Sequence, residues 1–209
     1  MAAAAVRSAD VLATFQSDLA RQRRTVEGWR REHDDEALTR RPSPRRWSAI
    51  DCLEHVRRAN GLYLKAMDRA LTGAERRGKR PVEEFRPGAV GTFMRNTLRP
   101  RTEEPTQDGR PKIARRMPTA GNFDPTKDAI PPDPGRTIDA FLGQLDRMTE
   151  LAQRLEGVDL HVRTNTLLGP FLRLRMGDVA RYLMAHTDRH LVQAERAIAS
   201  TQKADDGSE

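Results

Sequence analysis

Residues 45–56 read Arg-Arg-Trp-Ser-Ala-Ile-Asp-Cys-Leu-Glu-His-Val, and this stretch contains a clear start of a helix. Ser48, with an aspartate three residues later, has the form of a capping box, in which two side chains satisfy free backbone N–H groups of the first turn. The preceding segment 41–44 holds two prolines, which end any helix that comes before them. The pattern predicts a helix that begins at Ser48 and runs to about Leu71, where Gly73 ends it.

Three further segments carry apolar residues on one face of a helix. They lie at about 8–36, 137–156 and 177–199, and each repeats apolar side chains at helical intervals. The connections contain proline or glycine, and neither an internal repeat nor an alternating strand pattern is evident. Together with the helix that begins at Ser48, these segments predict an all-α fold in the form of a four-helix bundle.

A long Pro/Arg-rich segment, residues 74–136, separates the second and third predicted helices. It holds ten of the 13 prolines and lacks helical periodicity, so we expect an extended insertion within a single domain that covers residues 1–200. Met-Pro at 117–118 and Phe-Asp-Pro at 123–125 are expected to anchor this insertion on the bundle. The polar residues 201–209 are expected to form a disordered tail.

Charge and composition disfavour several classes of function. The formal net charge is +7, and most of the excess positive charge lies in one segment broken by prolines. Residues 75–136 contain fourteen Lys and Arg and nine Asp and Glu. We therefore expect weak, salt-sensitive adhesion to polyanions and no specific nucleic-acid binding. No apolar stretch has the length of a membrane span, and the single cysteine, Cys52, excludes an intramolecular disulfide. These features predict no membrane partner and a cytoplasmic location.

Histidines provide the strongest chemical signal. His186 and His190 are four residues apart in the last predicted helix, so their imidazoles project from one side of it. Such a pair can chelate a metal ion, although capping and core packing would also explain it. His55 is the best third ligand, because inward positions of facing helices meet in a bundle core. Three imidazoles and a water suit zinc or nickel. His33 and His161 lie in a charged helix end and in a connection, where local roles are expected.

The sequence resembles the DinB-like superfamily at both groups of histidines. The stretch 47–55 is similar to the Trp-Ser...His signature of this family, and the stretch 186–193 is similar to its closing helix, with His-x-x-x-His followed by Gln. The resemblance implies a four-helix bundle, a homodimer, and a metal site formed by His55, His186 and His190. Related members include S-transferases that use bacillithiol, mycothiol or a comparable thiol. The long insertion departs from short members of the family.

Two classes of function remain open. The first is a metal-dependent transferase that joins a low-molecular-weight thiol to a small electrophile; a metal-dependent hydrolase would activate water instead. The second is a non-catalytic, stress-related module that binds a metal or small ligand. This module would keep the three histidines without a paired general acid or base: Glu54 is turned by about 100° from His55, and Asp51 is expected to cap the helix.

Three other residues near these histidines have simpler interpretations. Trp47 is expected to be a packing anchor where the chain approaches the second helix, and Cys52 is expected to lie in the core. The family resemblance assigns a ligand role to the nearby histidine and not to Cys52. Gln193 is expected to hold a neighbouring helix or a ligand histidine through its amide.

Overall fold

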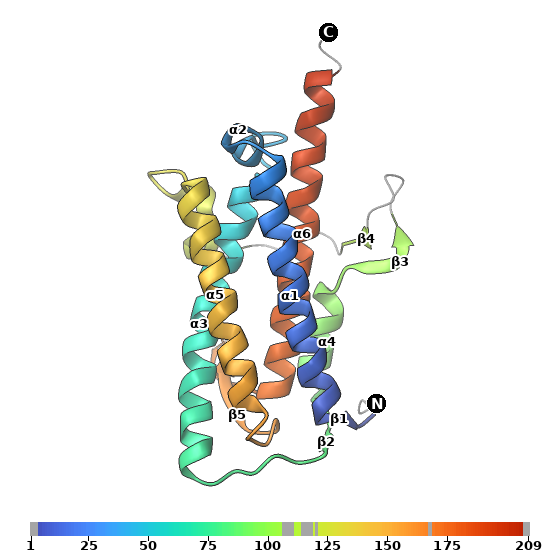
Figure 1. The fold of residues 1–209 in the computed structure, drawn as a ribbon, viewed down its shortest axis with the longest axis vertical. Helices are drawn as coiled ribbons and strands as arrows, with labels where there is room; N and C mark the ends of the chain where they lie inside the picture. Colours follow the sequence, from blue (N-terminus) through green and yellow to red (C-terminus); the bar gives the residue numbers. More distant parts are fainter. Residues whose placement is uncertain (1–3, 106–110, 114–118, 120, 167–168, 207–209) are drawn as a thin grey trace.

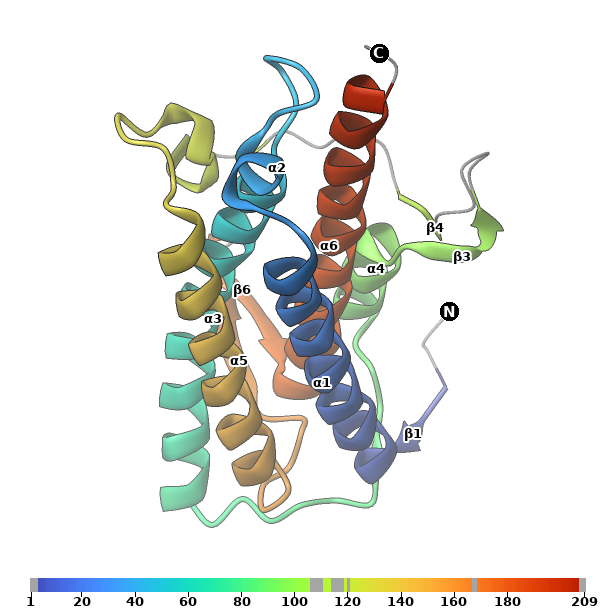
Figure 2. The same cartoon turned by 45° about the horizontal axis from the view of Figure 1, so that its top comes forward.

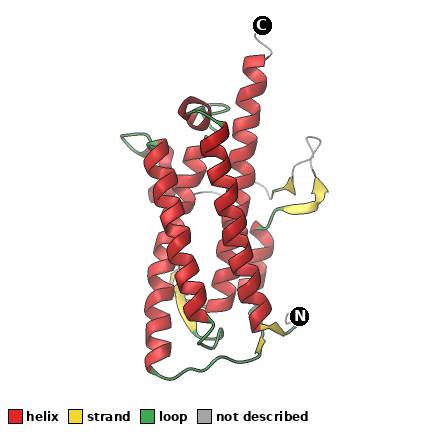
Figure 3. Ribbon diagram, viewed as in Figure 1, coloured by secondary structure: helices red, strands yellow, loops and turns green. Residues whose placement is uncertain are grey.

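The computed structural model describes residues 4–105, 111–113, 119, 121–166 and 169–206, and it is mostly helical. Four long helices form an elongated bundle (Figures 1 and 3), which confirms the predicted all-α fold. They are α1 (Ser8–Glu32), α3 (Ala49–Arg76), α5 (Pro134–Leu155) and α6 (Met176–Asp206). No helix within the described residues is both long and apolar enough to cross a membrane.

The start of α3 has the predicted capping box. The Ser48 hydroxyl accepts a hydrogen bond from the Asp51 backbone N–H at 3.0 Å, and the Asp51 carboxylate accepts one from the Ser48 N–H at 3.0 Å. Arg41 adds an ion pair to the same carboxylate, at 2.6 Å. These contacts fix the direction in which α3 leaves the proline-containing turn, and therefore the position of the residues two turns further along.

The four long helices pack as a ring in which each has two neighbours. α3 contacts α5 and α6, and α1 contacts the same two helices from the other side. The apolar stripe of each helix faces the centre of this ring, so the core is continuous along the bundle. Fully buried members of this core include Val26, Val56, Met67, Phe141, Met148 and Leu183.

Three small antiparallel strand pairs correct the expectation that the chain has no strands. β1 (Val6–Arg7) pairs with β2 (Glu84–Phe85), β3 (Arg101–Pro105) with β4 (Pro111–Lys112), and β5 (Arg163–Thr166) with β6 (Gly169–Arg175). In the third pair Thr164 faces Leu174, and both are buried. So few alternating residues give no detectable period-2 signal, which is why sequence periodicity missed these strands.

The insertion is more ordered than its prolines suggest. It contains α4 (Ala89–Leu98), which lies beside α6 outside the ring (Figures 1 and 2), and two 3-10 turns, η1 (Gly121–Phe123) and η2 (Pro125–Lys127), which pack on α3. Pro125 is buried, as expected of an anchor at 123–125. The other expected anchor, 117–118, lies outside the described residues.

The helix ends differ from the sequence expectations by a few residues. α1 ends at Glu32, and a separate short helix, α2 (Asp35–Thr39), follows it because the Asp34 carboxylate caps a new N-terminus. α3 continues past Gly73 to Arg76. α5 begins at Pro134, where the proline occupies the first helical turn and Asp133 caps it.

α6 continues to Asp206, so the first part of the tail expected at 201–209 is helical in the structure. Thr201 is buried, and its hydroxyl donates to the Ile198 carbonyl at 2.8 Å. The remaining residues of the predicted tail, 207–209, lie outside the described part of the chain.

Replacing Ser48 with Ala removes the cap of α3, and we expect it to lower the free energy of unfolding by about 1 kcal/mol, the usual cost of losing such a cap. Urea denaturation monitored by circular dichroism would measure the change. The matched control is Ser17→Ala, at an exposed position inside α1, where alanine suits the helix at least as well. Equal losses in the two variants would contradict the capping role.

Candidate metal centre

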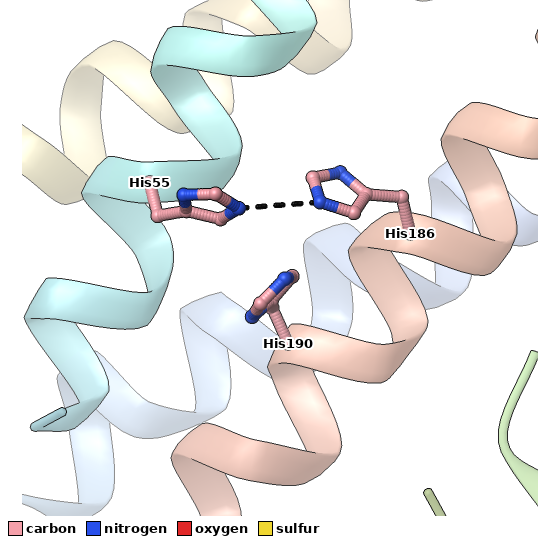
Figure 4. Close-up of side chains that lie close together, drawn as sticks. All are labelled: His55, His186 and His190. Carbon is pink, nitrogen blue, oxygen red and sulfur yellow. Dashed lines mark hydrogen bonds between the residues drawn. The ribbon is translucent and has the colours of Figure 1, made fainter. Parts of the chain in front are cut away.

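Three histidines meet in the core of the bundle (Figure 4). His55 comes from the second turn of α3, and His186 and His190 come from consecutive turns of α6. Each residue is only 7 to 8% exposed, and one ring nitrogen of each lies within 4.8 Å of the others. Among the described residues this is the group of His, Cys, Asp or Glu side chains that is arranged to hold a metal ion.

The spacing of two ring nitrogens matches that of metal ligands. Nε2 of His55 lies 3.2 Å from Nε2 of His186, along the dashed line in Figure 4. Two nitrogens that bind one tetrahedral zinc ion at about 2.0–2.1 Å are separated by about 3.3 Å. The rings of His55 and His186 are therefore separated by about the distance between two ligands of one cation.

A backbone carbonyl orients the His55 ring. Its Nδ1 lies 2.8 Å from the Phe123 carbonyl oxygen, which can only accept a hydrogen bond. Nδ1 of the neutral ring therefore carries the proton, and the lone pair lies on Nε2, the nitrogen that faces His186. This arrangement, a ligand histidine whose other nitrogen donates to a carbonyl, is the usual support of metal-binding histidines.

Each of the two histidine rings on α6 has a nitrogen without a hydrogen-bond partner in the described structure. Nδ1 of His186 and Nδ1 of His190 are buried, and neither has a hydrogen-bond partner in the described structure. In His186 this is not the nitrogen that faces His55, so a cation shared through the Nε2 atoms would leave its Nδ1 unchanged. The donor set of three imidazoles fits a borderline divalent cation.

Burial keeps all three imidazoles neutral at pH 7. It lowers the pKa of His55, an effect that the Phe123 carbonyl and Asp124 oppose. It lowers the pKa of His186 to about 3, with further contributions from His55 and Arg189. Burial also holds the pKa of His190 well below its usual value, reinforced by the neighbouring histidines and opposed by Gln193. The neutral imidazole is the form of histidine that binds a metal ion.

Aromatic rings enclose the cluster on two sides. Trp47 packs against His55 and His190, with ring centroids 4.8 and 5.8 Å away, and its indole N–H donates to Asp124 at 3.3 Å. Its role is thus broader than the packing anchor expected from the sequence. Tyr182 stacks parallel to His186 at 5.8 Å. Tyr182 was not among the candidate residues predicted from the sequence, although it lies four residues before His186 and therefore on the same face of the helix.

A segment of the insertion, residues 121–128, closes over the α3 side of the cluster, and we call it the site loop. Arg58 holds both ends of it: the guanidinium donates to the Asn122 carbonyl at 3.4 Å and forms an ion pair with Asp128. Between these contacts, the loop supplies the Phe123 carbonyl to His55. No sequence pattern indicates a contact made by a backbone carbonyl 68 residues away from its partner.

The alternative ligands considered from the sequence lie elsewhere. Cys52 is fully buried outside the cluster, and burial raises the pKa of its thiol. His161 bonds to Asp159 at 2.7 Å and accepts from the Arg86 N–H, while His33 caps the end of α1 through its backbone. Both are local roles, as the sequence predicted.

The two acids nearest His55 along the chain are already engaged by other groups. Asp51 belongs to the capping box. Burial would raise the pKa of Glu54, but hydrogen bonds from Arg57 and Arg58 outweigh it and lower the pKa. Neither carboxylate belongs to the group of candidate ligands among the described residues.

A comparison with known proteins adds one match. The family model described as the DinB superfamily matches residues 18–194, a range that includes all three histidines and the site loop. No curated protein and no solved structure matches the chain.

The lowered histidine pKa values predict how the stability of the metal-free protein depends on pH. Each imidazole takes up a proton near pH 6.5 in the unfolded chain but only at lower pH in the folded chain. Below pH 6.5 the unfolded chain therefore binds more protons than the folded chain, so the free energy of unfolding falls as the pH falls through 6.5. The contribution of His186 to this loss continues towards pH 3, because its folded-state pKa is about 3.

Replacing His186 with Gln removes one of these groups, so the free energy of unfolding in the presence of chelator should fall less between pH 7 and pH 5 than in the wild type. Urea titrations at pH 7, 6 and 5 would measure the two dependences. Parallel curves for the two proteins would show that His186 is not held neutral by the fold.

Proposed function

The chain belongs to the DinB superfamily, and we propose that it binds one divalent metal ion, zinc or nickel, through His55, His186 and His190. The observation that carries this proposal is the 3.2 Å separation of two Nε2 atoms in a buried cluster whose three rings are neutral. Two like nitrogens at this distance repel unless a proton or a cation lies between them. A third histidine in reach makes a cation the better explanation.

Each part of the chain has a separate task in this site. α6 supplies two ligands from one rigid face, α3 supplies the third, and the site loop fixes which nitrogen of His55 is free. Trp47 and Tyr182 restrict the rings from two sides and exclude water from their faces. Three protein ligands leave a position for an exogenous group, which is the mark of catalytic rather than structural zinc sites.

We propose further that the reaction is the transfer of a low-molecular-weight thiol to a small electrophile. A bound divalent cation would lower the pKa of a thiol placed beside it. Such a thiol gives its proton to solvent, and its sulfur forms a bond to the electrophile as the leaving group departs with its electron pair. This chemistry needs no side-chain acid or base, which agrees with a cluster that holds histidines alone among the described residues.

A cluster that holds histidines alone among the described residues also agrees with a non-catalytic metal-binding module, which is the second candidate function. A hydrolase that activates water commonly pairs its metal with a general base. The acids nearest His55 along the chain are engaged elsewhere, Asp51 in the helix cap and Glu54 with two arginines. Asp124, in the site loop, accepts hydrogen bonds from Trp47 and Thr126, so hydrolysis is the less supported of the catalytic alternatives. The homodimer and the cytoplasmic location expected from the sequence remain predictions.

Purified protein should carry about one divalent metal ion per chain. Replacing His190 with Ala should weaken zinc affinity more than about 100-fold. Losing a residue that only hydrogen-bonds a metal ligand typically costs about 10- to 100-fold in affinity, and losing the ligand itself costs more. The matched control is His161→Ala, which removes a histidine bound to Asp159 and should leave the affinity unchanged. Elemental analysis and competition titration would measure both variants.

Chelation should also lower the melting temperature, since a ligand that binds only the folded chain stabilises it. If the protein carried no metal and zinc or nickel left its melting unchanged, the proposed site would be wrong. If both histidine variants lost affinity equally, the assignment of His190 would be wrong.

The transferase proposal is tested by turnover with the metal-loaded protein. We expect it to accelerate the reaction of one low-molecular-weight thiol, among bacillithiol, mycothiol, glutathione and cysteine, with the electrophile 1-chloro-2,4-dinitrobenzene. The rate should fall to the uncatalysed level after chelation and in the His190→Ala variant. A metal-loaded protein that accelerates none of these reactions would favour the non-catalytic module.

A further inference from the structure

A cleft lies on the side of α6 that faces away from the histidine cluster. A cleft of about 720 Å³ runs between α1, α4 and α6. The α6 residues that line it include Arg181, Met184 and Asp188, which lie on the face of the helix opposite to His186 and His190. The cleft is therefore separate from the candidate metal centre, and its volume is typical of sites for small molecules.

Three arginines gather at the α4 end of this cleft without a close carboxylate partner. Arg95 and Arg99 line it from α4 and its C-terminal cap, and neither forms an ion pair with any described residue. Arg181 lines it from α6; its nearest carboxylate oxygen, in Asp178, is 3.9 Å away, and its Nη1 is buried without a hydrogen-bond partner. A buried guanidinium N–H without an acceptor is an open position for an anion.

Close packing of α4 on α6 forces this arrangement. The Gly88 N–H donates to the Asp178 carboxylate at 2.9 Å, and a Cβ on Gly91 would lie 2.5 Å from the Cβ of Asp178, so only glycine fits there. Arg95 follows Gly91 by one helical turn, and Arg181 follows Asp178 by three residues. The contact that joins the two helices therefore turns both arginines into the same cleft.

The arginines interact unfavourably with one another in this structure. Burial lowers the pKa of Arg95, and the charges of Arg181 and Arg99 lower it further, against an opposing contribution from Asp18. Burial likewise lowers the pKa of Arg181, opposed by Asp178. Like charges held together in a partly buried place are stabilised when an anion joins them.

Two acids of the cleft are held by side chains other than these three arginines. Asp18 and Asp188 are bound by Arg21, at 2.9 and 2.8 Å, and Gln22 also donates to Asp188. Asp10 and Glu195 line the cleft as well. The wall also has apolar residues, among them Phe15, Met184 and Leu191.

We propose that this cleft binds a small molecule that carries an anionic group, a phosphate monoester or a carboxylate, on an apolar body. Arg95, Arg99 and Arg181 hold the anionic group, and Phe15 and Met184 pack against the apolar body. The site is independent of the metal centre, because no residue is shared between them.

Calorimetric titration at low salt with three soluble probes tests this proposal. Phenyl phosphate and benzoate carry the two candidate anions on the same ring, and benzyltrimethylammonium carries a cation of similar size. We expect saturable binding of at least one anion, a rise in melting temperature with that anion, and no binding of the cation. The anion that binds with the higher affinity identifies the preferred anionic group.

Replacing Arg95 with Gln should weaken binding of that anion tenfold or more, the usual range for losing a hydrogen bond to a charged group. The matched control, Arg76→Gln, removes an exposed arginine at the end of α3 and should bind as the wild type does. Melting without anion would show that both variants are folded, and their metal content should be unchanged. Absence of saturable anion binding, or equal affinity in Arg95→Gln and wild type, would overturn the proposal.

Discussion

The packing of α3 against α6 is the constraint on which the rest of this structure depends. The apolar stripes of the two helices must be buried, and each stripe carries histidine within it: His55 on one helix, His186 and His190 on the other. Burying the stripes therefore brings three imidazoles together and removes them from water. Their neutrality, their missing hydrogen bonds and their ligand-like spacing all follow from this packing.

The insertion turns a cluster of histidines into an oriented site. Without the site loop, the His55 ring would be free to carry its proton on either nitrogen. The Phe123 carbonyl removes that freedom, and the contacts of Arg58 with Asn122 and Asp128 hold the carbonyl in place. A segment that looks like a break in the helical pattern thus contributes the outer support that metal-binding histidines usually have.

α6 connects two sites through its opposite faces. One face presents His186 and His190 to α3, and the other presents Arg181 to the cleft beside α4. Both faces bury groups that an apolar core would not need, and both leave nitrogen atoms without partners. Natural proteins keep such costly arrangements mainly where a ligand compensates for them. The two sites call for ligands of opposite charge, a cation among the imidazoles and an anion among the arginines.

Local chemistry in the sequence determined the helices and the histidine pair of α6. The capping box at Ser48, the apolar stripes and the four-residue spacing of His186 and His190 are contained within short segments, so they are visible without a structure. The match to the DinB superfamily supports the same bundle. Tertiary packing alone decided which faces meet. The Phe123 carbonyl, the stacking of Trp47 on His55 and the approach of Arg95 to Arg181 join residues that are distant in the chain. No local periodicity records such contacts, because they depend on how whole helices pack against one another.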